Sequence, residues 1–229
     1  MKSVKKITFS SYLQAKMAID KTRVDALMFD MDGTLWDAMD SYAEVWNRTF
    51  AEYGEEVHIT GRDLLHGMGK TLDQILAMIC ENFGTKNYGE RFLQRVDEIE
   101  DELLPRMGGT LYPDVKEGIA QLSQHYKIFL VSNCGVNGLS NFVDFTGLRQ
   151  YVTDFLTYGM TKMAKSDNML LLKERYGLQN PIYVGDTQGD CNETHRAGMK
   201  FVYCSYGFGN CADYDMKADN FKQIIDYFL

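Results

Sequence analysis

The stretch Ala26-Leu27-Met28-Phe29-Asp30-Met31-Asp32-Gly33-Thr34 decides how the rest of the chain is interpreted. Its four leading apolar residues are typical of a strand that is buried on both faces of a parallel sheet. Two acids follow at the predicted carboxyl end of that strand, where open α/β sheets bind their ligands. The stretch therefore predicts an α/β fold with a pair of carboxylates at its ligand-binding edge.

Further apolar runs along the chain have the same character as the first one. Strong runs cover residues 128–131, 181–184 and 201–204, and a weaker run covers residues 155–158. Longer amphipathic stretches alternate with these runs, as expected when helices cover both faces of a parallel sheet. We therefore predict a doubly wound parallel sheet, the Rossmann-like arrangement.

Almost a hundred residues separate the first strong run from the second, which is too many for a simple crossover helix. Apolar residues recur there at helical spacing, namely at Leu72, Ile75, Leu76, Ile79, Phe92, Val96, Ile99 and Leu103. We expect residues 38–108 to form a small, mobile, all-helical cap domain that ends at the flexible pair Gly108-Gly109. Residues 24–37 and 109–229 would form the catalytic core.

Residues 1–23 predict an N-terminal helical arm, because Tyr12, Ala15 and Ile19 fall on one helical face. We assign no chemistry to this arm.

The overall charge and the cysteines limit the classes of partner and of compartment. The chain has 24 Lys and Arg against 32 Asp and Glu, a formal charge of -8, which opposes binding to nucleic acid or to an anionic membrane. Its five cysteines include no Cys-x-x-Cys pair, so neither a disulfide framework nor a zinc site is indicated. No apolar run approaches the roughly 18 residues of a membrane span. A reducing cytoplasm fits best.

More acids follow the run at 181–184, where Gly185 and Asp186 come next and Asp190 lies four residues further on. A carboxylate that attacks a phosphate meets charge repulsion, which only a cation can offset. Oxygen ligands without His or Cys favour Mg²⁺. The acids are therefore candidates for a magnesium site, the alternative being a helix N-cap with a surface acid.

Groups that suit a phosphoryl oxygen follow the two remaining runs. Ser132 offers a hydroxyl and Asn133 a backbone N–H, although this pair could instead cap the next helix. Lys162 and Lys165 follow the weaker strand, before a predicted helix over residues 168–176. Either lysine could supply the positive charge that the crevice needs.

In their order along the chain, these motifs resemble those of the haloacid dehalogenase superfamily. The motifs are Asp30-Met31-Asp32-Gly33-Thr34, then Ser132, then Lys165, then Gly185-Asp186 with Asp190. The chain is most similar to the phosphatase branch with a small helical cap inserted after the first strand, the phosphoglycolate phosphatase and beta-phosphoglucomutase-like proteins. The likeness covers about residues 24–206.

The resemblance implies a role for each matching residue. Asp30 would attack phosphorus and become an aspartyl-phosphate, and Asp32 would serve as general acid and then as general base. Ser132 and Lys165 would hold the phosphoryl group, and Thr34 would help to order the loop.

It also implies a magnesium site. Asp30, the backbone carbonyl of Asp32 and Asp186 would bind Mg²⁺, and Asp190 would bind it directly, through water or through the lysine. An acid at Asp32 argues against dehalogenation.

Two positions depart from that family pattern, and a third lies where it places substrate contacts. Ser166 follows Lys165 where Pro is often found. Trp36 replaces a smaller apolar residue, a change that we expect not to touch the chemistry directly. In the predicted cap, Lys70 lies in a Gly-rich loop where family caps contact the substrate, so Lys70 is a candidate for substrate specificity; a simple helix start is the alternative.

The predicted function is magnesium-dependent hydrolysis of a small soluble phosphomonoester, such as phosphoglycolate, a sugar phosphate or a nucleoside monophosphate. A phosphomutase of the beta-phosphoglucomutase type is the alternative, because the same aspartyl-phosphate serves both reactions. A non-catalytic receiver-like phosphoacceptor is a third hypothesis, because receiver domains also place clustered aspartates, a Thr or Ser and a Lys around magnesium. The expected partner is a small phosphorylated metabolite.

Overall fold

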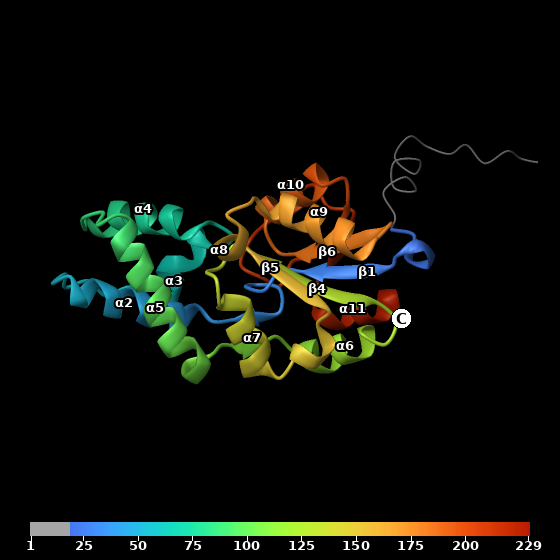
Figure 1. Ribbon diagram of the computed structural model, residues 1–229, viewed down its shortest axis with the longest axis horizontal. Helices are drawn as coiled ribbons and strands as arrows, with labels where there is room; N and C mark the ends of the chain where they lie inside the picture. The colour runs from blue at the N-terminus through green and yellow to red at the C-terminus, as the bar shows by residue number, and fades with distance from the viewer. Residues whose placement is uncertain (1–18) are drawn as a thin grey trace, which may run out of the picture.

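The computed structural model describes residues 19–229, and a six-stranded sheet runs through its core (Figure 1). The strand order is β5-β4-β1-β6-β7-β8, and every neighbouring pair is parallel. The strands are β1 (Ala26–Phe29), β4 (Lys127–Ser132), β5 (Asp154–Thr157), β6 (Pro181–Gly185), β7 (Lys200–Cys204) and β8 (Met216–Ala218). All of the predicted runs form strands, whereas β8 was not predicted because it has no apolar run.

Helices cover both faces of this sheet, so the predicted doubly wound fold is confirmed. In Figure 1, α6 (Val115–Leu122), α7 (Gly138–Thr146) and α11 (Phe221–Phe228) lie below the sheet, and α9 (Lys165–Tyr176) and α10 (Gln188–Arg196) lie above it. Alternate residues of β1 enter two separate cores: Leu27 and Phe29 pack in one, Ala26 and Met28 in the other. The unbroken apolar run is the consequence of that two-sided burial.

The order of the strands determines where the polar strand ends meet. Strand β1 lies between β4 and β6, and Phe29 is in register with Leu130 on one side and with Val184 on the other. The chain builds β4 and β5 on one side of β1 and then β6, β7 and β8 on the other side. The carboxyl end of β1 is therefore the point where the strand order reverses, which is the usual ligand-binding crevice of such sheets.

Residues 39–107 are mostly helical and lie together beyond the carboxyl end of the sheet (Figure 1). The elements are α2 (Met39–Glu52), α3 (Gly61–Leu64), the 3-10 turn η2 (Leu65–Gly67), α4 (Leu72–Phe83) and α5 (Glu90–Met107). Aromatic side chains join α2 to α5, and the ring centroids of Phe50 and Phe92 are 4.7 Å apart. These rings belong to the same apolar core as Leu27 and Phe29 of β1, and that core continues from the sheet into the helical segment.

Two chain crossings connect the helical segment to the sheet. The short strands β2 (Trp36–Asp37) and β3 (Thr110–Leu111) pair there as an antiparallel ribbon. Next to β3, Gly108 has a φ of 57°, and a side chain at this position would overlap the ring of Phe145. Ser41 donates a hydrogen bond of 2.6 Å to the Gly108 carbonyl. The glycine is thus required by a left-handed backbone and by close packing.

Most of the predicted N-terminal arm lies outside the described residues, which begin at Ile19. The described part contains one 3-10 turn, η1 (Lys21–Arg23), and Ile19 is buried. Three further short elements are α8 (Tyr158–Thr161) and the 3-10 turn η3 (Arg149–Tyr151), which flank β5, and the bridge between Asp32 and Trp36. Within residues 19–229, no helix has both the length and the apolar character needed to cross a bilayer.

Candidate active site

The carboxyl ends of β1, β4 and β6 bring Asp30, Ser132 and Asp186 together, although they are far apart in the sequence. Asp30 is buried, with 3% of its surface exposed, and lies beside the equally buried Lys165. Lys165 Nζ is 3.0 Å from Asp30 Oδ1 and 2.6 Å from Asp190 Oδ1. The lysine therefore bridges two of the acids.

Lys165 is the first residue of α9, so this helix begins three residues earlier than predicted. Burial opposes the charge of Lys165, but the carboxylates of Asp190 and Asp30 outweigh burial and hold its pKa well above the usual range. Lys162 ends α8 in a left-handed conformation, and its Nζ lies 5.5 Å from the centroid of the Tyr158 ring. Of the two lysines that the sequence left open, only Lys165 contacts Asp30 in the described structure.

Asp30, Asp186 and Asp190 form a group in which one oxygen from each lies within 4.8 Å of the others. Asp186 Oδ2 accepts hydrogen bonds from the backbone N–H groups of Phe208 and Gly209, whereas Asp186 Oδ1 is buried and has no partner among the described residues. Burial and the neighbouring Asp190 raise the pKa of Asp186 to about 7. A buried oxygen without a donor, in a cluster of oxygen ligands, fits a hard cation such as Mg²⁺.

Asp190 has two structural partners besides its place in this group. Its Oδ1 accepts from Lys165, and its Oδ2 accepts from the backbone N–H and the hydroxyl of Thr187, at 3.0 and 2.7 Å. Thr187 is the N-cap of α10, and Asp190 completes the capping box. The N-cap is therefore Thr187 and not one of the two acids, and both Asp186 and Asp190 are buried, so the alternative of an acidic N-cap with a surface acid is wrong.

Gly33, within the first motif, lies directly against Asp186. This residue has a φ of 76°, and a side chain here would overlap the Asp186 carboxylate. Only glycine combines the left-handed backbone with such a close approach.

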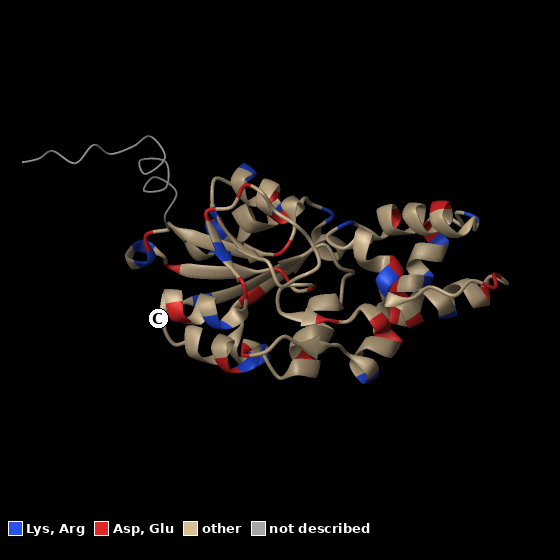
Figure 2. Ribbon diagram, turned by 180° about the vertical axis from the view of Figure 1, so that it is seen from behind, with Lys and Arg blue, Asp and Glu red and all other residues tan. Residues whose placement is uncertain are grey.

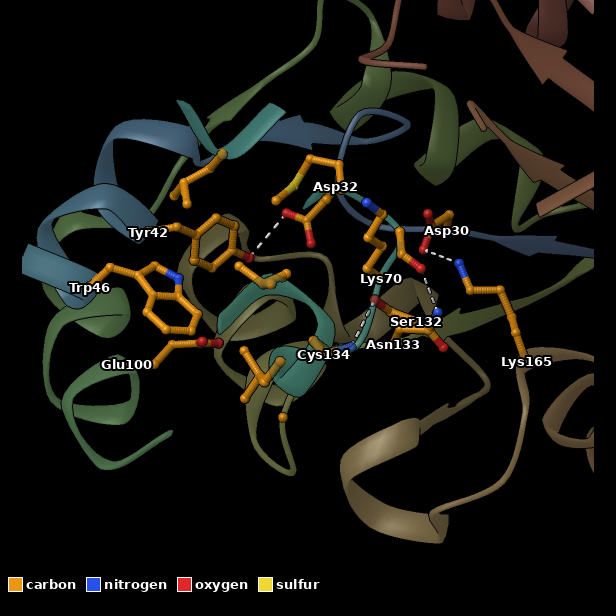
Figure 3. Close-up of a pocket in the computed structure, with 16 residues that line it drawn as sticks. Asp30, Asp32, Tyr42, Trp46, Lys70, Glu100, Ser132, Asn133, Cys134 and Lys165 are labelled. Carbon is orange, nitrogen blue, oxygen red and sulfur yellow. Dashed lines mark hydrogen bonds and ion pairs between the residues drawn. The ribbon is translucent and has the colours of Figure 1, made fainter. Parts of the chain in front are cut away.

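Asp32 is held by two donors that the sequence did not assign to the site. Trp36 Nε1 donates to Asp32 Oδ1 at 2.9 Å, and Tyr42 Oη donates to the same oxygen at 3.0 Å (Figure 3). The expectation that Trp36 does not touch the chemistry is therefore wrong, because the turn after Asp32 brings its indole N–H back to the carboxylate. Burial raises the pKa of Asp32 to about 6, although both hydrogen bonds lower it.

Ser132 and Asn133 do not cap the following helix, since α7 begins at Gly138. Ser132 ends β4, and its hydroxyl accepts a hydrogen bond of 3.3 Å from the Cys134 backbone N–H. The Asn133 side chain donates a hydrogen bond of 2.7 Å to the carbonyl of Gly69 in the helical segment (Figure 3). This contact joins the sheet edge to the loop that carries Lys70.

That loop leads into α4, which Thr71 caps through a capping box, so the helix start expected as an alternative for Lys70 is also present. Lys70 itself lines a cavity of ≈ 60 Å³ between the strand ends and the helical segment. The cavity is lined by Asp30, Asp32, Ser132, Asn133 and Lys165 on the sheet side. Its other walls come mainly from α2, α4 and α5, and include Tyr42, Trp46, Leu64, Ile75 and Glu100.

Comparison with known proteins shows the family of the chain. The profile of the family described as haloacid dehalogenase-like hydrolase matches residues 27–204, and the chain belongs to this family. Among solved structures, a predicted phosphoglycolate phosphatase from Haemophilus somnus is 19% identical with a TM-score of 0.78, over 90% of this chain and 99% of that one. A haloacid dehalogenase-like hydrolase from Streptococcus pneumoniae has a TM-score of 0.75 at 19% identity, over 91% and 100% of the two chains.

Two curated relatives refine the class within that family. The phosphoglycolate phosphatase of Psychrobacter arcticus is 24% identical over 219 residues, which cover 89% of this chain and 95% of the relative. The phosphoglycolate phosphatase of Synechococcus elongatus is 26% identical over 194 residues, 82% and 86% of the two chains. The chain is an enzyme of the family's phosphatase branch, as the sequence motifs predicted.

Proposed function

We propose that this protein is a magnesium-dependent phosphohydrolase that acts on a small phosphomonoester through an aspartyl-phosphate. One observation carries the proposal: the buried Asp30 carboxylate has both a lysine and further acids beside it. It lies 3.0 Å from Lys165 Nζ and within 4.8 Å of carboxylate oxygens of Asp186 and Asp190. Asp186 Oδ1 has no partner among the described residues. Such an arrangement offers a nucleophile together with the positive charge that a phosphoryl group requires.

The proposed reaction has two steps. Asp30 attacks phosphorus and the bond from phosphorus to the leaving oxygen breaks, while Asp32 donates its proton to that oxygen. Water then attacks the aspartyl-phosphate, and Asp32 takes a proton from this water as inorganic phosphate leaves and the Asp30 carboxylate is restored. A pKa of about 6 for Asp32 suits both roles near neutral pH. Ser132 and Lys165 hold the phosphoryl oxygens.

Residues that could hold the metal follow from the same geometry. The side chains of Asp30 and Asp186 and the backbone carbonyl of Asp32 would bind Mg²⁺, which when bound offsets the negative charge of the phosphoryl group. Both oxygens of Asp190 already accept hydrogen bonds from Lys165 or Thr187. We therefore assign Asp190 chiefly to the positioning of Lys165.

We further propose that residues 38–108 act as a cap, and that residues 24–37 and 109–229 form the catalytic core. The hydrogen bond from Asn133 to Gly69 and the cavity between the two parts support this division. Lys70, which lines that cavity, is proposed to contact the substrate. The five free cysteines agree with a reducing compartment, for which we propose the cytoplasm.

The decisive experiment is a phosphate-release screen over small phosphomonoesters, with Mg²⁺ and with EDTA. Phosphoglycolate belongs in the screen because the relatives bear its name. We expect release that depends on Mg²⁺ and stops in EDTA. Conversion of glucose 1-phosphate to glucose 6-phosphate without release would instead support the phosphomutase alternative, and an aspartyl-phosphate that forms without turnover would support the receiver-like one.

Tyr42→Phe is expected to displace the acidic limb of the pH profile of kcat toward higher pH. The variant loses the Tyr42 hydrogen bond, which lowers the pKa of Asp32, so that pKa rises above about 6 and less of the ionised base is present at pH 6. We expect kcat at pH 6 to fall about sevenfold, since a hydrogen bond to a charged group contributes about 1.5 kcal/mol, or about one pKa unit. Phosphate release measured from pH 5 to pH 8 checks this.

Tyr53→Phe is a matched control, because Tyr53 is the C-cap of the same helix and its hydroxyl makes no hydrogen bond within residues 19–229. Its pH profile should coincide with that of the wild type. A displaced profile in the control, or an undisplaced one in Tyr42→Phe, would contradict the assigned role of Tyr42.

A further inference from the structure

One acid in the cavity takes no part in the proposed reaction. Glu100, on α5, is 93% buried and lines the cavity wall contributed by the helical segment. No side chain or backbone group within residues 19–229 donates a hydrogen bond to its carboxyl group. A buried carboxyl without a partner is costly, because its lost hydration is not replaced. Such a group facing a cavity points to a ligand that supplies the missing partner.

Two aromatic side chains lie on the same side of the cavity as Glu100. Figure 3 shows Trp46 next to Glu100, with the Tyr42 ring between this pair and Asp32. Trp46 is buried, and its indole N–H finds no acceptor in the described part of the chain. Lys70, by contrast, lies on the side of Asp30 (Figure 3). The two lysines of the cavity, Lys70 and Lys165, therefore lie with the reacting groups, whereas the opposite side carries an acid and aromatic rings.

The charges around Glu100 reinforce this polarity. Acidic residues are frequent on the helices of this segment (Figure 2). Burial and the nearby carboxylates of Asp97, Asp32 and Asp101 together raise the pKa of Glu100 to about 8. Glu100 therefore loses its proton less readily than an exposed glutamate does. An ammonium group beside this carboxyl would ionise it and offset the surrounding negative charge, whereas a carboxylate would add to the repulsion.

We propose that Glu100 and Trp46 recognise an ammonium group on the alcohol part of the substrate, so that the preferred substrate class is the small aminoalkyl phosphates. The ammonium would donate to the Glu100 carboxylate and lie against the Trp46 ring, a combination that proteins use for organic cations. This inference rests on the proposed phosphatase function and adds the identity of the leaving alcohol.

The lining of the cavity indicates the character of that alcohol. The apolar side chains of Leu64 and Ile75 line it between the polar groups, which suits a short methylene chain. We therefore expect a short chain, of two to four carbons, between the ester oxygen and the ammonium nitrogen.

The test compares esters that differ only in the terminal group. Aminoalkyl phosphates with two, three and four carbons are assayed beside hydroxyalkyl phosphates and phosphorylated hydroxy acids of the same lengths, phosphoglycolate being the two-carbon acid. For at least one length we expect kcat/KM to be tenfold or more higher for the amine than for the alcohol, and lowest for the acid. No preference for the amine, or a preference for the acid, would overturn the proposal and would favour Lys70 as the specificity residue.

Two substitutions on the same helix locate the effect. Glu100→Gln keeps the shape of the side chain but cannot ionise, and it should reduce the ratio of amine to alcohol to within about threefold of one. Glu98→Gln removes a charge from the exposed face of α5 and should leave that ratio as in the wild type. A ratio that Glu100→Gln leaves unaltered would contradict the role of Glu100.

Binding without turnover separates this inference from the proposed function. Calorimetric titration of the Asp30→Asn protein should give a Kd at least tenfold lower for the aminoalkyl phosphate than for its hydroxyalkyl counterpart. Equal Kd values would reject the ammonium site even if the wild type hydrolyses both esters. The opposite outcome is also distinguishable. If the Asp30→Asn protein binds the amine selectively but the wild type releases phosphate from no alkyl or aryl phosphate, the ammonium site stands and the proposed hydrolase activity is rejected.

Discussion

Asp30→Asn is expected to lower phosphate release from an aryl phosphate by about 10⁴-fold or more, because the amide cannot form the aspartyl-phosphate. The loss should appear in kcat at saturating substrate, since Ser132 and Lys165 still hold the phosphoryl group. Steady-state release of phosphate measures the loss of turnover. Quenched samples are examined for a phosphoryl group bound to the protein, which reports the aspartyl-phosphate. Only the wild type should show the transient phosphoenzyme.

The same substitution is expected to raise the melting temperature of the metal-free protein. Burial raises the pKa of Asp30 well above its usual range, and Lys165 offsets only part of this effect, while Asp190 and Asp186 add to it. The carboxylate is therefore present at a cost to stability that the neutral amide avoids. Asp40→Asn, on the exposed surface of α2, is the control and should change neither activity nor melting temperature. Retained turnover in Asp30→Asn would refute this nucleophile.

Removal of Mg²⁺, or of the Asp186 carboxylate that is proposed to bind it, is expected to lower kcat by about 10³-fold. A bound cation contributes several kcal/mol to the stabilisation of charge in such reactions. In wild-type protein, Mg²⁺ at 100 times its Kd should also add about 2.7 kcal/mol to the free energy of unfolding. For a chain of this length that corresponds to roughly 5–10 °C in melting temperature.

Asp186→Asn should abolish this thermal shift, because Asp186 Oδ1 is the buried oxygen without a partner among the described residues. Asp190→Asn is the informative comparison. It should lose activity, since Lys165 loses its 2.6 Å partner, yet it should keep a clear Mg²⁺-dependent shift. Equal loss of the shift in both variants would indicate that Asp190 binds the metal directly, and an unaltered shift in Asp186→Asn would contradict the proposed site.

Some residues of the candidate site could be predicted from the sequence, and others could not. Asp30 and Asp186 follow strong apolar runs, so their place at strand ends could be predicted from the runs alone. Tyr42 could not, because its hydroxyl reaches Asp32 only after α2 has folded back over the strand end. Glu100 did leave a signal: it lies four residues after Val96 and three before Leu103, on the apolar face of α5. An acid on the apolar face of a helix is expected to be buried, but the sequence does not indicate what the buried acid does.

By itself, the sequence determined the fold class, the helical segment and the set of acids, because apolar periodicity and strand-end motifs are local properties of the chain. The short strands β2, β3 and β8 carry too few residues for any period and exist through their pairing. Only the tertiary structure placed Lys165 and not Lys162 against Asp30, gave Asp32 its two donors and left one oxygen of Asp186 without a partner among the described residues. Charge, hydrogen bonding and burial act across distances of 3–5 Å in space, which the order of residues does not specify.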